Sequence, residues 1–189
     1  MQRIPSPRWV PRTAAALLMS ILLAGCAEMV STADPGQDGA RVRFRLAEPG
    51  RVFVSEAMPT PCFFGTDATV GRVVQVSYNT HAIQWIVESR LGRLGMPGGE
   101  QYPSISYAET RVRAGVPIAL RFKMMEGAET LNMFPRYVQW RMTLEPGKDY
   151  EILVGNALRS IAVSQIVSDA DGNRLVPVAN AMRTPYCPA

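Results

Sequence analysis

The chain has 189 residues and a formal net charge of +4 at pH 7. Three arginines near the N-terminus supply most of that charge, and about +1 remains without them. This near-neutral balance excludes a strongly basic protein that binds nucleic acid, because such proteins need clustered cations to neutralise phosphates. The roughly 160 residues that follow the N-terminal segment are enough for a single domain with a sizeable core.

The first 25 residues have the composition of a secretory signal. Arg3, Arg8 and Arg12 give a basic start without any acidic residue, and an apolar run at 14–23 follows. This run is shorter than the roughly 20 residues that a membrane-spanning helix needs. Residues 23–26 (LAGC) resemble the lipobox of bacterial lipoproteins, so the chain is expected to be a lipoprotein with a signal peptide at 1–25.

The resemblance implies a covalent lipid anchor. In bacterial lipoproteins the thiol at the position of Cys26 receives a diacylglyceryl group, and cleavage then makes that residue the acylated N-terminus. Stable attachment needs more than one acyl chain, and such proteins usually carry three, including a palmitate-type chain. Ala27 stands where an aspartate often marks inner-membrane retention, which implies the periplasmic face of the outer membrane. The alternative is an ordinary signal in which Cys26 is incidental.

Beyond Cys26, the segment 26–39 lacks hydrophobic periodicity and is predicted to be a flexible tether, with a single domain at 40–189. Two cysteines remain, Cys62 and Cys187. An even pair in an exported protein predicts a disulfide, with two free buried thiols as the alternative. Redox catalysis is disfavoured because no Cys-x-x-Cys spacing is present.

The domain is predicted to be all-β. Short segments of alternating polarity, rich in β-branched and aromatic residues, are separated by turns containing Gly, Pro or Asp. This pattern favours an antiparallel β-sandwich, or a small barrel, of about seven to nine strands, similar to small periplasmic β-sandwich lipoproteins. The predicted strands are 41–46, 51–55, 70–78, 106–113, 116–125, 137–144, 150–154, 160–168 and 175–178.

Short turns between consecutive segments predict hairpins. They join 41–46 to 51–55, 106–113 to 116–125, 137–144 to 150–154, and 160–168 to 175–178. In the first of these strands, Arg41, Arg43 and Arg45 alternate with apolar residues, which predicts a solvated face opposite a buried one.

Two segments are harder to assign. Residues 80–91 fit a helix or a strand, and their β-branched and aromatic content favours a strand. The Gly-rich loop that follows is predicted to be a mobile connector or a contact surface, and a connector is the simpler interpretation. If the loop is a contact surface, its apolar residues Leu94, Met96 and Pro97 are the candidates.

No residue pattern indicates catalysis. The chain has one histidine, His81, and no Gly-x-Ser-x-Gly motif around a nucleophilic serine. One histidine and two paired cysteines cannot form a tetrahedral zinc site, so neither a metal nor a cofactor is expected. Asp169, Asp171 and Asn173 resemble the start of a calcium loop, but the acidic ligand that should follow is missing, and a turn is the better interpretation.

Two functional hypotheses remain. The first is a non-enzymatic lipoprotein domain, held at the membrane through Cys26, that binds a protein or another component of the envelope. The second is a carrier whose apolar cavity holds a small ligand. A third, an envelope hydrolase that uses His81 as a base, has the least support.

Overall fold

The structure is a computed structural model that describes residues 35–65, 69–78, 92–124 and 136–188. The predicted signal, Cys26 and most of the predicted tether lie outside these residues, as does the segment 80–91, whose assignment as strand or helix was open. In the described ranges, no helix is both long and apolar enough to cross a bilayer.

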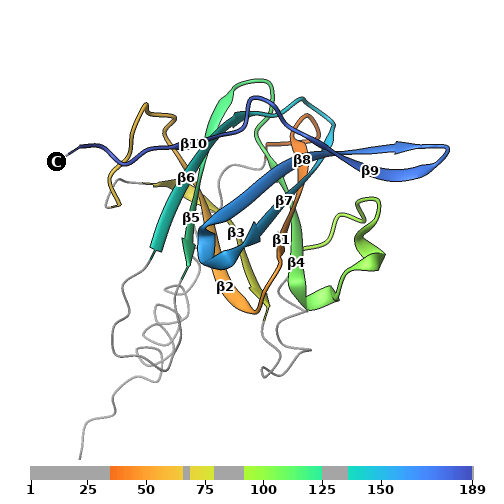
Figure 1. Ribbon diagram of the computed structural model, residues 1–189. Helices are drawn as coiled ribbons and strands as arrows, with labels where there is room; N and C mark the ends of the chain where they lie inside the picture. Colours follow the sequence, from red (N-terminus) through yellow and green to blue (C-terminus); the bar gives the residue numbers. More distant parts are fainter. Residues whose placement is uncertain (1–34, 66–68, 79–91, 125–135, 189) are drawn as a thin grey trace, which may run out of the picture. The chain divides into compact units, whose positions relative to one another are not determined.

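The described part of the chain contains ten strands in two five-stranded sheets, which confirms the all-β sandwich (Figure 1). One sheet has the order β4-β1-β7-β8-β9 and the other the order β10-β6-β5-β2-β3. The strands are β1 (Ala40–Leu46), β2 (Gly50–Ala57), β3 (Thr69–Tyr78), β4 (Tyr107–Val112), β5 (Pro117–Met124), β6 (Arg136–Thr143), β7 (Asp149–Gly155), β8 (Ser160–Asp169), β9 (Gly172–Pro177) and β10 (Met182–Thr184).

Alternation along each strand sends one face inward, as the sequence predicts. Val42, Phe44 and Leu46 of β1 are all buried, and the ring of Phe44 lies 6.4 Å from that of Phe122 on β5 in the facing sheet. Each such side chain contributes about 1.5–3 kcal/mol when fully buried. The interior between the sheets therefore holds the fold together.

One pair of strands departs from the antiparallel pattern of the sandwich. β1 runs parallel to β7, with Arg41 opposite Asp149 and Val42 opposite Tyr150, while the other described pairs are antiparallel. A parallel pair needs a long connection, and 108 residues separate Arg41 from Asp149. Such a distant pairing leaves no local sequence signal.

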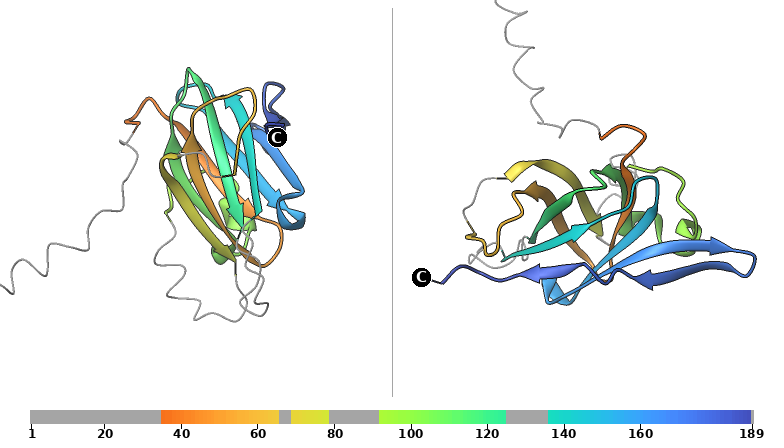
Figure 2. Two further views of the ribbon diagram at one scale, coloured as in Figure 1. Left: turned by 90° about the vertical axis from the view of Figure 1, so that its left-hand side faces the viewer. Right: turned by 90° about the horizontal axis from the view of Figure 1, so that it is seen from above.

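Three of the predicted hairpins are wrong. β1 and β2, β4 and β5, and β6 and β7 each lie in different sheets, so the short turn between them crosses the sandwich. A Pro/Gly turn predicts that the chain reverses, but the next strand can lie beside the first or about 10 Å away in the facing sheet. Only the pair 160–168 with 175–178 is confirmed: β8 and β9 form a hairpin that extends beyond the sandwich (Figures 1 and 2).

Candidate functional site

The predicted disulfide is present. Cys62, which follows β2, is bonded to Cys187, near the end of the chain, across a sequence separation of 125 residues. The two segments also form backbone hydrogen bonds. The amide of Phe63 donates to the carbonyl of Pro185 at 3.0 Å, and the amide of Cys187 donates to the carbonyl of Phe63 at 3.1 Å. The bond therefore fastens the C-terminal tail to the segment that leaves β2.

The middle of the Gly-rich loop is buried, at Met96, Gly98 and Gly99. Of its three predicted contact residues, Leu94 is 37% exposed, Met96 only 3%, and Pro97 is intermediate. Met96 is therefore not available to a partner. Close packing explains two of the glycines in this loop. A Cβ on Gly92 would lie 2.7 Å from the carbonyl oxygen of Glu109, and one on Gly99 would lie 2.9 Å from the guanidinium of Arg43.

The prediction that Arg43 lies on a solvated face is wrong, because the loop covers it. The Arg43 side chain is 1% exposed and lies between two buried carboxylates, 2.9 Å from Glu109 Oε1 and 3.5 Å from Glu151 Oε2. Its guanidinium also donates to the carbonyls of Met96 and Pro97, at 2.8 and 3.0 Å. Glu109 completes the network by accepting from the backbone amide of Met96 at 3.2 Å. A charged cluster thus holds the loop on the outer face of the sheet.

Two tyrosines of the loop region extend this cluster. Arg45 stacks on Tyr102 at 4.1 Å and Arg93 on Tyr107 at 4.0 Å, both within the range of a cation–π contact. Burial, followed by the negative charge of Glu151, raises the pKa of Tyr102 above its usual value. Because these charges and rings contact one another, we assign the cluster a structural role.

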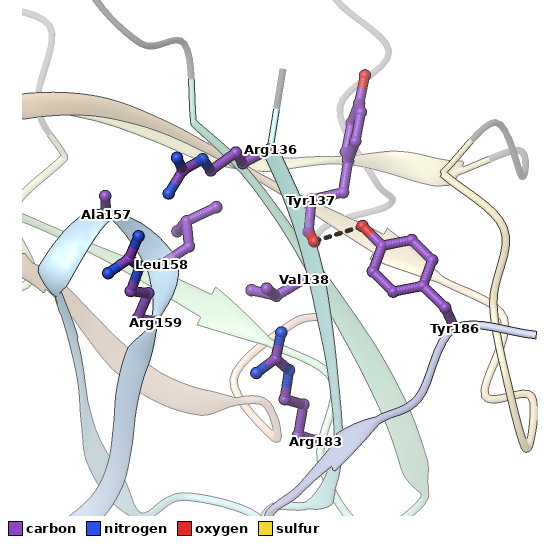
Figure 3. A pocket seen from close by; sticks show the side chains of 8 residues that line it. All are labelled: Arg136, Tyr137, Val138, Ala157, Leu158, Arg159, Arg183 and Tyr186. Carbon is purple, nitrogen blue, oxygen red and sulfur yellow. Dashed lines mark hydrogen bonds between the residues drawn. The ribbon is translucent and has the colours of Figure 1, made fainter. Parts of the chain in front are cut away.

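A pocket of about 390 Å³ lies at the margin of the sandwich (Figure 3). One wall of the pocket is formed by the start of β6 and by β10 with the tail that follows it. The opposite wall is formed by the turn between β7 and β8. The lining residues are Arg136, Tyr137, Val138, Ala157, Leu158, Arg159, Arg183 and Tyr186.

Strand alternation explains why arginines line this pocket. Val138 belongs to the buried core, so Arg136, two residues earlier on β6, lies on the same inner face. Arg183 on β10 is the register partner of Trp140, which packs against the core from that face. In Figure 3, the side chains of Arg136, Arg159 and Arg183 extend toward the space beside Leu158 and Val138. Three guanidiniums from three separate segments therefore surround one hollow.

The turn that forms the other wall has an unusual backbone. Ala157 and Leu158 have φ angles of 50° and 68°, in the left-handed region that non-glycine residues avoid at a cost of about 1–2 kcal/mol each. Leu158 is 3% exposed, and burial of a leucine contributes about 1.5–3 kcal/mol, which offsets much of this cost. The buried Leu158 thus holds the turn in the conformation that presents Arg159 to the pocket.

The described lining of the pocket is positively charged. It contains no acidic residue, and within the described residues neither Arg159 nor Arg183 forms an ion pair. Five other arginines of the domain pair with carboxylates: Arg41, Arg43, Arg45, Arg113 and Arg174. The hydroxyl of Tyr186 is already engaged, donating to the carbonyl of Tyr137 at 2.7 Å. The arrangement suits anion binding, and the described lining residues offer no nucleophile or general base.

The remaining chemical candidates give no further site. His81 lies outside the described residues. Asp169 accepts hydrogen bonds from the amide of Asp171 and the guanidinium of Arg174, both at 3.1 Å, which confirms the turn interpretation. Across the described ranges, no group of His, Cys, Asp and Glu side chains is arranged to hold a metal ion.

The sequence predicted the disulfide but missed the arginine pocket. The residues of the pocket are spread from 136 to 186 along the chain. Each arginine on its own is an ordinary residue for a strand end or a turn. The only available signal was weak: Arg136 and Val138 share a strand face, so one arginine of this strand had to lie toward the interior. No protein-family model matches the chain, and no curated protein matches it.

Proposed function

We propose that this chain is a lipid-anchored lipoprotein of the bacterial cell envelope, attached through Cys26 at the periplasmic face of the outer membrane. Its β-sandwich is a non-catalytic domain that binds a partner in the envelope. The observation that supports binding is the pocket, in which arginine and tyrosine side chains surround a hollow and no acidic residue stands among the described lining residues. The disulfide between Cys62 and Cys187 supports export, because such bonds persist in oxidising compartments such as the periplasm.

The alternative, a carrier with an apolar cavity, has less support. The described core residues fill the space between the sheets with large side chains, including Phe44 and Phe122 in contact across it. The pocket opens instead at the margin, and three of its eight lining residues are arginines. A charged lining favours a polar, acidic partner over an apolar ligand.

The proposal is tested by photo-crosslinking in intact cells. A photoreactive amino acid at position 159, on the pocket wall, is expected to give discrete adducts with an envelope component. The same group at Asn173, an exposed position at the β8–β9 turn, serves as the matched control and is expected to give none of these adducts. Identical adducts from both positions, or none from position 159, would contradict a binding role for the pocket.

A further inference from the structure

The pocket brings three arginines together. Arg136, Arg159 and Arg183 come from β6, the β7–β8 turn and β10, and no acidic side chain is among the described lining residues. Arg159 and Arg183 are exposed and, in the described part of the chain, make no ion pair. Like charges that line one hollow repel, so a bound anion would stabilise Arg159 and Arg183 in this arrangement.

The number and geometry of the arginines narrow the class of anion. A single carboxylate has two oxygens and one charge, and one guanidinium engages both oxygens in a fork. A phosphate monoester carries about −1.5 to −2 charges at neutral pH and three terminal oxygens, so it can accept from guanidiniums on several sides. We propose that the pocket binds a phosphate group carried by a small organic molecule or a lipid headgroup, an inference that rests on the proposed binding function.

The remaining lining fits the organic part of such a ligand. The volume of about 390 Å³ lies near the lower end of ligand pockets and suits a headgroup-sized molecule. Val138 and Leu158 supply an apolar floor, and Tyr186, 52% exposed at the rim, offers a ring for contact. In this arrangement the phosphate contacts the arginines, and the organic group attached to it contacts Val138 and Leu158 or extends into solvent beside Tyr186.

Binding by the purified full chain tests this proposal. Glycerol 3-phosphate is the free phosphate probe, with uncharged glycerol as its control, and isothermal calorimetry measures the affinity. Phosphatidic acid vesicles are the headgroup probe, because this lipid carries a phosphate monoester, with phosphatidylcholine vesicles as their control, and flotation measures the bound fraction. Binding to either phosphate probe above its control supports the proposal, and the probe that binds identifies the source of the phosphate.

Two variants connect binding to the pocket. Arg159→Gln and Arg183→Gln remove charges at exposed positions, so both variants are expected to fold, and each is expected to weaken phosphate binding about tenfold. Arg174→Gln, on the exposed strand β9, is the matched control and is expected to bind as the unmodified chain does. Because every variant carries the same N-terminal segment, that segment cannot account for a difference between them.

Three outcomes would overturn the phosphate assignment. Neither probe binds above its control; binding is unchanged in the variant that combines R159Q and R183Q; or a triglutamate peptide binds in an arginine-dependent manner while both phosphate probes fail. The third outcome would leave the proposed binding function intact and change only the ligand, to a carboxylate-bearing partner. Failure of the proposed function itself is recognised separately, by crosslinking in cells.

Discussion

Replacing both Cys62 and Cys187 with serine is expected to lower the free energy of unfolding by about 2–5 kcal/mol. The bond closes a loop across 125 residues of sequence, so its loss frees a large part of the unfolded chain. The tail would then be held on the segment after β2 only by backbone hydrogen bonds and by the contact between Phe63 and Tyr186, whose rings lie 4.3 Å apart. Urea unfolding followed by circular dichroism measures the change.

Reduction supplies the control for this prediction. Dithiothreitol is expected to destabilise the unmodified protein by a similar amount and to leave the Cys62→Ser/Cys187→Ser variant unchanged. Equal unfolding midpoints for the unmodified protein with and without reductant would show that the thiols are not bonded in solution. The pocket lies beside the same tail, through Arg183 and Tyr186, so the reduced protein is also the form in which one wall of the pocket is least constrained.

Replacing Arg43 with methionine is expected to destabilise the domain by about 3–5 kcal/mol, because it leaves Glu109 buried without its cation and removes one of the two cations that contact Glu151, which keeps Arg45. The side chains of Glu109 and Glu151 are only 2% and 1% exposed, so water cannot replace the guanidinium. The loop, whose Met96 and Pro97 carbonyls accept hydrogen bonds from Arg43, would also lose this attachment to the sheet. Chemical unfolding measures the loss of stability, and hydrogen exchange of the Met96 amide measures the release of the loop.

Two variants serve as controls for the Arg43 prediction. Arg174→Met removes an arginine whose ion pair with Asp169 is exposed on both sides, at 64% and 41%, and is expected to change stability by no more than about 0.5 kcal/mol. Adding Glu109→Gln and Glu151→Gln to Arg43→Met removes the buried charges and is expected to recover part of the loss. If Arg43→Met and Arg174→Met are equally stable, Arg43 does not hold the loop.

The sequence predicts the fold class well because alternation is a local property. The pattern of β1 requires no knowledge of its neighbours to show that Val42 and Phe44 face a core. Strand pairing is not local: the turn at Pro49 looks the same whether β2 returns beside β1 or crosses to the facing sheet. The pairing of β1 with β7 depends on strands more than 100 residues apart, so the sandwich was predictable and its strand order was not.

The same distinction explains the errors at the candidate sites. Arg43 appeared to be a solvated strand residue because its partners, Glu109 and Glu151, become its neighbours only in the folded register. The disulfide was predictable because the number of cysteines and the expectation of export both come from the sequence, without knowledge of the fold. The arginine pocket was not predictable, because Arg159 reaches it through a left-handed turn at Ala157 and Leu158. The sequence has no glycine at these two positions to indicate that conformation.

The proposed export and lipid attachment at Cys26 would determine which compartment, and therefore which partners, the proposed binding domain can meet. Mass spectrometry of the N-terminal peptide, taken from the protein in native membranes, tests this most directly. The expected result is a peptide that begins at Cys26 and carries a diacylglyceryl group on sulfur and an acyl chain on its amine. A peptide that retains residues 1–25, or that carries an unmodified thiol at Cys26, would contradict the proposed anchoring.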